Sequence, residues 1–380
     1  MLSPYLILFF FLIAISFRVN EKNNDRLSKL VALVLGAFLA LRFGQGTDWP
    51  AYCYIYLSSP EGFNFNSSYF GNGIHSDIGW KVLNTVFHSI GISYIHFSVI
   101  ISVIEIYYLY KFIRKYSDNG VLSFLLLYPS VYFIYMFSTL RQGLVIAIFL
   151  GQGLHLLQED KYAKYIILSS LLVTIHSSAL AFFLLLVIKK QSVKSLYICL
   201  IPAFLIGLSG NLWIPRLLSY FGDAGIYSTR EGSPAAFSYQ IVIFSLITML
   251  YLGSNKQAQN TSDIYLMKVY LFGLALYLLL STNSLVASRF SVPFMAVECA
   301  LVSCYLCAGI DRRQQMLLVS VICLAATAML IKNLNYVSSQ SLLPADRSGI
   351  YYPYFSLFNH EDFYKLYSGY YVNATQQLFY

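Results

Sequence analysis

Three arginines, Arg42, Arg141 and Arg289, each lie close to one end of a long apolar segment of this 380-residue chain. An ionisable group at membrane depth is costly and is therefore a functional candidate. The guanidinium is a planar fork of donors that stays charged and binds phosphate through two hydrogen bonds. If these ends face one side of a membrane, the set predicts a site for a lipid-linked phosphate or diphosphate. The alternative is that they snorkel to the interface or pair with local carboxylates such as Asp48 and Asp77.

Residues 42–56 combine the first of these arginines with a carboxylate and phenols. Asp48 followed by Pro50 is typical of a helix N-cap and first turn. On such a helix Asp48, Tyr52 and Tyr56 are spaced by four residues and share one face. A carboxylate and two phenols beside an arginine suit hydroxyl recognition or general-base catalysis. Helix capping alone is the competing role for Asp48.

Two further polar residues interrupt apolar segments. Gln142 directly follows Arg141 and can add amide donors or acceptors. His176 lies in the polar stretch 174–178, where a base, a phosphate donor and a hydrogen-bonded turn residue remain equal alternatives. Two deeper acids are expected to pack against lysines instead: Glu105 and Glu298, against Lys111 or Lys268.

The composition indicates how these residues are positioned. The chain is 58% hydrophobic and only 11% charged, whereas about 25% of the residues of a soluble domain are charged. So few charges cannot cover the surface of a soluble fold of this size. We predict an all-α polytopic membrane protein, which excludes a soluble enzyme, a disulfide-stapled secreted domain and a nucleic-acid binder.

A helix needs roughly 20 mainly apolar residues to cross a bilayer. The chain contains a series of suitable runs, at 2–17, 28–43, 94–113, 120–138, 140–157, 163–190, 195–212, 238–253, 264–282, 285–309 and 314–332. These runs predict about 11–12 transmembrane helices.

Connections rich in lysine and arginine are expected on the cytoplasmic side. Residues 163–190 conflict with a simple alternation because basic residues flank both ends. If the chain turns back at the polar stretch 174–178, both ends stay inside and both chain termini lie outside. The alternative is one long tilted helix.

With this topology, residues 1–380 form a single transmembrane domain. Three segments then face outward: the main periplasmic loop 44–93 with its loop helices, a short periplasmic loop 213–237 and the aromatic-rich C-terminal tail 333–380. The tail tyrosines are expected to form an interfacial belt or to stack on sugars. Walker, dinucleotide-binding and Cys/His metal motifs are absent from the sequence, so we expect no cofactor, no bound metal and no nucleic-acid partner.

The chain resembles the EpsG family, which belongs with the Wzy-type O-antigen and capsule polymerases. Short stretches carry the resemblance through their order and spacing: RFGQGTDWPAY (42–52), SDIGWKVLN (76–84), STLRQGLVIA (138–147), IHSSALAFF (175–183) and SRFSVPF (288–294). The resemblance covers about residues 1–335. Many relatives are expected to have Glu where this chain has Asp77, so the charge is kept.

This resemblance implies a GT-C-like glycosyltransferase of the bacterial inner membrane with its active site facing the periplasm. Such an enzyme moves a growing glycan from undecaprenyl diphosphate to the non-reducing end of a new lipid-linked repeat unit, in O-antigen, capsule or exopolysaccharide synthesis. Its partners would be these lipid-linked oligosaccharides, membrane lipids and a chain-length regulator. A flippase for the same lipid-linked oligosaccharides, an O-antigen ligase and a membrane acyltransferase are the alternatives.

The implied roles fall on the residues already singled out. Arg42, Arg141 and Arg289 would bind the diphosphate and offset its developing charge. Asp48 or His176 would be the base. The remaining candidates would position substrate: Tyr52, Asp77 and Gln142.

Overall fold

A computed structural model describes residues 2–20, 22–65, 68–71, 77–219, 231–253, 261–307, 311–340 and 348–366. All regular elements in these ranges are helices, so the all-α fold is confirmed. Those of the first half are α1 (Pro4–Ser16), α2 (Asn24–Ala40), α3 (Trp49–Leu57), α4 (Ser68–Gly71), α5 (Ile78–Ser89), α6 (Tyr94–Tyr116), α7 (Gly120–Leu127), η1 (Tyr128–Met136), α8 (Leu140–Ile148), η2 (Phe149–Gly153), α9 (Leu154–Gln158), α10 (Tyr162–Ile175), η3 (Ser177–Leu184) and α11 (Leu185–Ile188). Those of the second half are α12 (Val193–Leu208), α13 (Gly210–Ser219), α15 (Pro234–Gly253), α16 (Thr261–Leu280), α17 (Ser284–Met295), α18 (Glu298–Cys307), α19 (Arg312–Ser339), η5 (Gly349–Tyr351) and α20 (His360–Leu366).

Long apolar helices confirm a polytopic membrane protein. Among the described residues, 5 helices are long and apolar enough to cross a bilayer, or up to 7 if each of two bent pairs is one span. The bent pairs are α12 with α13, at 80°, and α17 with α18, at 43°. Shorter apolar helices occupy the other predicted runs, at Pro4–Ser16, Gly120–Met136, Tyr162–Ile175 and Ser177–Ile188. The predicted 11–12 crossings depend on counting these shorter helices and α2.

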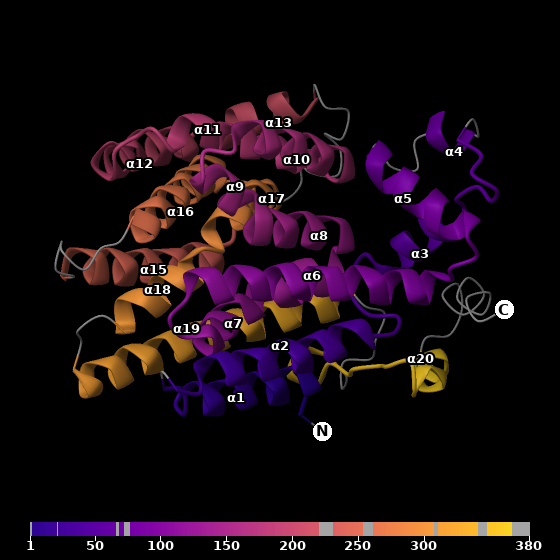
Figure 1. Ribbon diagram of the computed structural model, residues 1–380, viewed down its shortest axis with the longest axis horizontal. Helices are drawn as coiled ribbons and strands as arrows, with labels where there is room; N and C mark the ends of the chain where they lie inside the picture. The colour runs from indigo at the N-terminus through magenta and orange to yellow at the C-terminus, as the bar shows by residue number, and fades with distance from the viewer. Residues whose placement is uncertain are drawn as a thin grey trace.

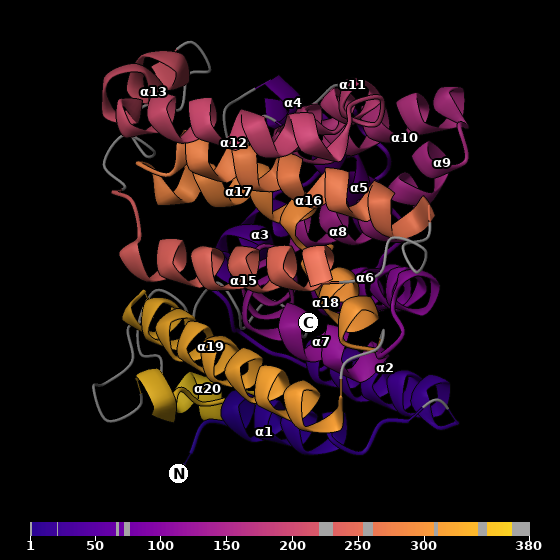
Figure 2. The same cartoon turned by 90° about the vertical axis from the view of Figure 1, so that its left-hand side faces the viewer.

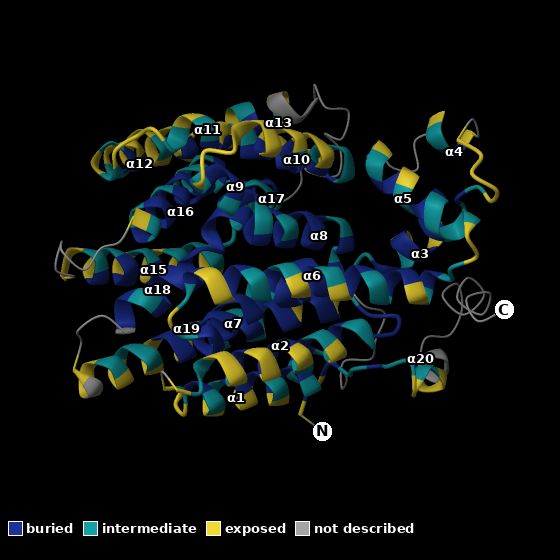
Figure 3. Cartoon of the chain, viewed as in Figure 1, coloured by how far each residue is buried: buried dark blue, intermediate teal, exposed yellow. Residues whose placement is uncertain are grey.

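The helices lie side by side in tiers, from α12 through α16 and α15 to α19 (Figures 1 and 2). Residues between the tiers are mostly buried, whereas exposed residues lie on the outward faces of α1, α2 and α12 (Figure 3). Large apolar side chains remain uncovered on these faces, such as Leu33 at 63% exposure and Ile201 at 65%. Such a surface is expected of a protein whose solvent is hydrocarbon.

Residues 163–190 form the predicted hairpin. The chain changes direction at His176, between α10 and η3. The Tyr165 hydroxyl donates to the Phe182 carbonyl at 2.7 Å, and the Lys189 amine donates to the Leu157 carbonyl at 2.6 Å. Both basic ends of the segment therefore lie together, and the alternative of one long tilted helix is wrong.

The loop 44–93 contains helices, as predicted, and they gather at one end of the bundle with α20 (Figure 1). We call this the outer end. An aromatic cluster fixes α3 and α5 against the first turns of α6 and α8. Its members include Trp49, Tyr52, Trp80, Tyr94, Phe97 and Leu140. Because the cluster is buried, the outer loop is a packed unit rather than a loose connection.

The C-terminal tail packs against the segment that leads into this unit. The Phe43 amide donates to the Phe355 carbonyl at 2.9 Å, and the Leu357 amide donates to the Leu41 carbonyl at 2.9 Å. Gly44 has a φ of +66°, and a Cβ there would collide with the Phe363 ring. The tail therefore holds the loop that carries the candidate site residues.

The tail departs from two expectations. Helix α19 continues to Ser339, so the tail begins after residue 339 rather than at 333. Tyr352 is only 3% exposed and stacks on Tyr5, so it belongs to the core and not to an interfacial belt. Residues 341–347 and 367–380 of the tail, and 220–230 of the short loop, lie outside the described residues.

Candidate functional site

An ion pair between Arg141 and Asp77 joins the outer unit to the bundle. Arg141 lies in the first turn of α8, which three residues separate from the π-helical η1, and Asp77 directly precedes α5. The guanidinium Nη1 contacts the carboxylate Oδ2, and the two side chains are 12% and 10% exposed. Arg141 therefore pairs with Asp77, which is the alternative to phosphate binding that the sequence left open. A single removal would leave the other charge buried, which makes the pair a strong geometric constraint.

Asp48 occupies the N-cap position of α3, but its side chain makes no capping hydrogen bond. Its carboxylate accepts instead from the Thr47 hydroxyl at 2.9 Å. Burial raises the pKa of Asp48 above its usual range, opposed by the Thr47 hydrogen bond and by the charges of Arg289 and Arg141. Since capping does not occupy this carboxylate, the role that competed with chemistry is not realised.

Tyr52 lies one turn after Asp48, as the helical spacing predicts. Its side chain is 4% exposed, and the Arg141 guanidinium carbon lies 5.6 Å from its ring centroid. Burial raises the pKa of Tyr52 to about 12, with the Arg141 charge acting in the opposite direction. The phenol is thus a neutral hydrogen-bonding group that also flanks the guanidinium.

Gln142 ties α8 to α17 at the same level. Its side-chain amide donates to the Arg289 backbone carbonyl at 3.0 Å. This bond fixes the position of Arg289 relative to Arg141, which is adjacent to Gln142. The charges of Arg289 and Arg141 both act on Asp48, so Arg289 belongs to the same group as Arg141 and Asp48.

His176 lies at the turn of the hairpin and is 7% exposed. Its Nδ1 accepts from the Ser178 amide at 3.3 Å and lies 2.8 Å from the Ser178 hydroxyl. The side chain therefore caps η3, which is the hydrogen-bonded turn role that the sequence left open. Arg141 and Arg289 are its charged neighbours, so His176 also borders the group.

Arg42 lies apart from this group. It is 3% exposed, and its Nη1 donates to the Leu39 carbonyl at 2.7 Å and the Ser102 hydroxyl at 3.1 Å. Its guanidinium carbon lies 5.2 Å from the Phe137 ring centroid. Its Nε and Nη2 have no hydrogen-bond partner among the residues that the structure describes. The predicted cluster of three arginines is therefore two arginines at the site and one buried nearby.

Glu105 is the charged neighbour of Arg42 and is fully buried, and within the described ranges neither carboxylate oxygen has a hydrogen-bond partner. The expected packing of Glu105 against Lys111 is wrong, because Lys111 donates to Gln152. The expected packing of the second deep acid against Lys268 is also not observed. Glu298 accepts from Tyr239 at 3.5 Å, and Lys268 donates to the Lys189 carbonyl. The sequence indicated the depth of these two acids along their helices, but it did not show which face of each helix they occupy.

The sequence did not single out Thr47 or Gly143. Thr47 precedes Asp48 directly, so a hydroxyl beside a candidate carboxylate was the available signal. Gly143 follows Gln142, and a Cβ there would lie 2.5 Å from Glu105 Oε1. Nothing local in the sequence indicates that contact. Within the described ranges no group of three or more His, Cys, Asp or Glu side chains could hold a metal ion.

The group can act chemically on an anionic leaving group. Arg141 and Arg289 supply fixed positive charge, which stabilises charge that develops on phosphate oxygens. Asp48 is a carboxylate whose raised pKa makes it a stronger base once it is ionised. Tyr52 and Gln142 add a phenol and an amide to the same group.

Comparisons with known proteins give one family. Residues 25–356 match the model of the EpsG family. No curated protein matches the chain, and no solved structure matches it. The match runs from α2 to the part of the tail that bonds to Phe43, and it includes every candidate site residue.

Proposed function

Since the chain belongs to the EpsG family, whose members are Wzy-type polymerase-like proteins, we propose that it polymerises lipid-linked oligosaccharide repeat units. The single observation that carries the proposal is the group formed by Arg141, Arg289 and Asp48 at the outer end of a membrane bundle. The donor would be a glycan on undecaprenyl diphosphate, and the acceptor a hydroxyl of the next lipid-linked unit. The product would be an O-antigen, capsule or exopolysaccharide chain.

We further propose that the outer end faces the periplasm and that the bundle lies in the bacterial inner membrane. The basic ends of the 163–190 hairpin lie together away from α3 and α5, which supports this orientation. A GT-C-like arrangement is part of the same proposal. On the periplasmic side no nucleotide sugar is needed, because the lipid diphosphate is itself an activated leaving group.

In the proposed reaction the acceptor oxygen attacks the anomeric carbon of the donor. The bond between that carbon and the diphosphate oxygen breaks, and undecaprenyl diphosphate leaves with the bonding electrons. The acceptor proton passes to the Asp48 carboxylate and then to water. Arg141 and Arg289 offset the charge that appears on the diphosphate.

The other candidates support this step. Tyr52 and Gln142 position substrate, and Asp77 fixes the orientation of the Arg141 guanidinium. His176 keeps the hairpin turn in place and is the alternative base. Arg42, buried beside Glu105, has less direct access to a diphosphate than the other two arginines, and we assign it to holding the loop that precedes Asp48.

A strain that lacks this protein tests the proposal through its envelope polysaccharide and its lipid-linked intermediates. We expect single repeat units without polymer on a gel, with full chain length restored by the wild-type protein. Single lipid-linked units stalled on the cytoplasmic face would indicate a flippase instead. Polymer that accumulates on the lipid carrier at the periplasmic face would indicate a ligase. Either result would contradict polymerisation.

The pH dependence of polymerisation tests Asp48 as the base. Its raised pKa means that the carboxylate becomes protonated, and the base is lost, at a higher pH than for an ordinary aspartate. We expect the rate in proteoliposomes to fall on acidification with an acid limb above the usual aspartate range. Asp48→Asn should slow the reaction about 100-fold or more, and the residual rate should lack this limb.

Asp118→Asn is a matched control, because Asp118 is exposed and far from the outer end of α6. It should keep the wild-type rate and profile. His176→Ala measured beside it separates the two candidate bases. Normal polymerisation by both Asp48→Asn and His176→Ala would contradict the assignment of a base at this site.

A further inference from the structure

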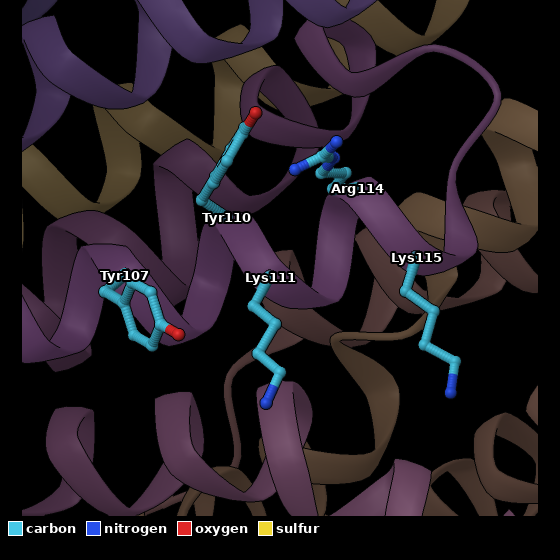
Figure 4. A pocket seen from close by; sticks show the side chains of 5 residues that line it. All are labelled: Tyr107, Tyr110, Lys111, Arg114 and Lys115. Atoms are coloured by element: carbon cyan, nitrogen blue, oxygen red, sulfur yellow. The ribbon is translucent and has the colours of Figure 1, made fainter.

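The end of α6 opposite the candidate site carries a cavity of about 400 Å³. Its lining residues are Tyr107, Tyr110, Lys111, Arg114 and Lys115, and we call it the α6 groove. Lys111 and Lys115 extend side by side in one direction, while Tyr110 and Arg114 bound the other side of the groove (Figure 4). The sequence singled out only Lys111 among them, as an expected partner of a deep acid, and did not predict a recess between these side chains.

The charge in the groove is only partly compensated. Arg114 Nε lies 3.6 Å from Asp25 Oδ1, with both side chains largely exposed. Lys111 donates to the neutral side chain of Gln152, and Lys115 contacts His155. Neither lysine has a carboxylate within ion-pair distance in the described part of the chain.

The groups that face the groove from neighbouring helices do not remove this excess. Helix α2 contributes Asp25, which is shared with Arg114. Glu159 follows α9 and acts on Lys115 through its charge, but it is shared with Lys161 at 2.6 Å and with His155 at 3.3 Å. Two lysines therefore present positive charge that an anion could neutralise.

An apolar track leads into the groove along the same helix. Val103, Tyr107, Lys111 and Lys115 are spaced by four residues and form one row on α6. Val103 is 57% exposed and Tyr107 is 58% exposed. Moving toward the helix end, this row thus changes from exposed hydrocarbon through a phenol to two ammonium groups. The order matches a lipid, with its chain in the bilayer, its ester region at the interface and its phosphate outermost.

We propose that the α6 groove binds the phosphate of an anionic membrane phospholipid, whose acyl chain lies along Val103 and Tyr107. Clustered lysine and arginine side chains at the end of a membrane helix attract anionic lipid headgroups in this way. The site is separate from the candidate polymerisation site, because α6 begins at Tyr94 in the outer aromatic cluster and ends at the groove. A bound lipid would hold the last turns of α6 against α2 and α9.

Reconstitution of the purified full-length protein into nanodiscs that contain equal amounts of phosphatidylglycerol and phosphatidylcholine tests this proposal, with the retained lipids counted by native mass spectrometry after release into detergent. We expect phosphatidylglycerol to be preferred over phosphatidylcholine, and we expect Lys111→Gln with Lys115→Gln to reduce that preference about tenfold or more. Lys111→Arg with Lys115→Arg should retain it, which shows that the charge matters and that the fold tolerates changes at these positions. Loss of the preference in the arginine variant would contradict a phosphate site.

Lys190→Gln with Lys194→Gln is the matched control, because both lysines are exposed, basic and outside the groove. This variant should keep the lipid preference. An equal loss in the control would mean that general surface charge is responsible, and would overturn the proposal. Glycerol 3-phosphate supplies the soluble source of the same chemistry. Binding of this soluble ester as tightly as the lipid would overturn the assignment of a membrane lipid.

Discussion

Replacement of Arg141 by lysine is expected to stop chain elongation at single repeat units. Lysine keeps the charge and can still approach Asp77, but it lacks the planar fork and cannot flank the Tyr52 ring as the guanidinium does. Removal of one preorganised donor from an oxyanion site costs about 100-fold to 1000-fold in rate. We expect a loss of this size in a proteoliposome elongation assay, and single repeat units on a polysaccharide gel.

Arg313→Lys is the control for this prediction. Arg313 is exposed in the first turn of α19, far from the Arg141–Asp77 pair. The same exchange of side chains should leave chain length and expression level unchanged there. Full-length polymer made by Arg141→Lys would show that a point charge is sufficient, and would remove the case for bidentate phosphate binding.

Gly143→Ala is expected to disrupt both the bundle and the site. The added Cβ would lie 2.5 Å from Glu105 Oε1, 2.6 Å from the Tyr135 carbonyl oxygen and 2.8 Å from Met136 Cα. Two of these are backbone atoms, so α8 would have to move away from η1. Overpacking of this kind costs about 1–3 kcal/mol of folding free energy. Because Arg141 and Gln142 are in the same turn of α8, we also expect polymerisation to be lost.

The sign of the stability change makes this prediction specific. In a helix without a packing conflict, Gly→Ala stabilises by about 1 kcal/mol. Gly253→Ala provides that reference, because no atom of the described part of the chain lies within 4 Å of a Cβ added at the end of α15. Thermal unfolding in detergent should show a lower midpoint for Gly143→Ala and an unchanged or higher midpoint for Gly253→Ala. A stabilised and active Gly143→Ala protein would contradict the close packing of α6, η1 and α8.

Local features of the sequence determined the helices and indicated that polar residues gather at one end of the bundle. Apolar runs located the spans, since the bilayer requires long apolar helices whatever their neighbours are. The basic residues at both ends of 163–190 and the polar stretch around His176 predicted the hairpin that the Tyr165–Phe182 bond confirms. Asp48 and Pro50 predicted the start of the helix that follows, because such signals act within one turn, although the Asp48 side chain makes no capping hydrogen bond.

The partners of the charged residues were decided by the tertiary structure. Arg141 and Asp77 are separated by 64 positions along the chain, and their pairing depends on how α5 docks against α8. Depth placed Arg42 and Glu105 only approximately, because the rotation of each helix about its axis decides which neighbour a side chain meets. Packing at Gly143 and the binding of the tail to Phe43 are likewise contacts between distant segments. Hydropathy therefore determines which segments enter the membrane, whereas side-chain packing between helices determines which polar groups form the site.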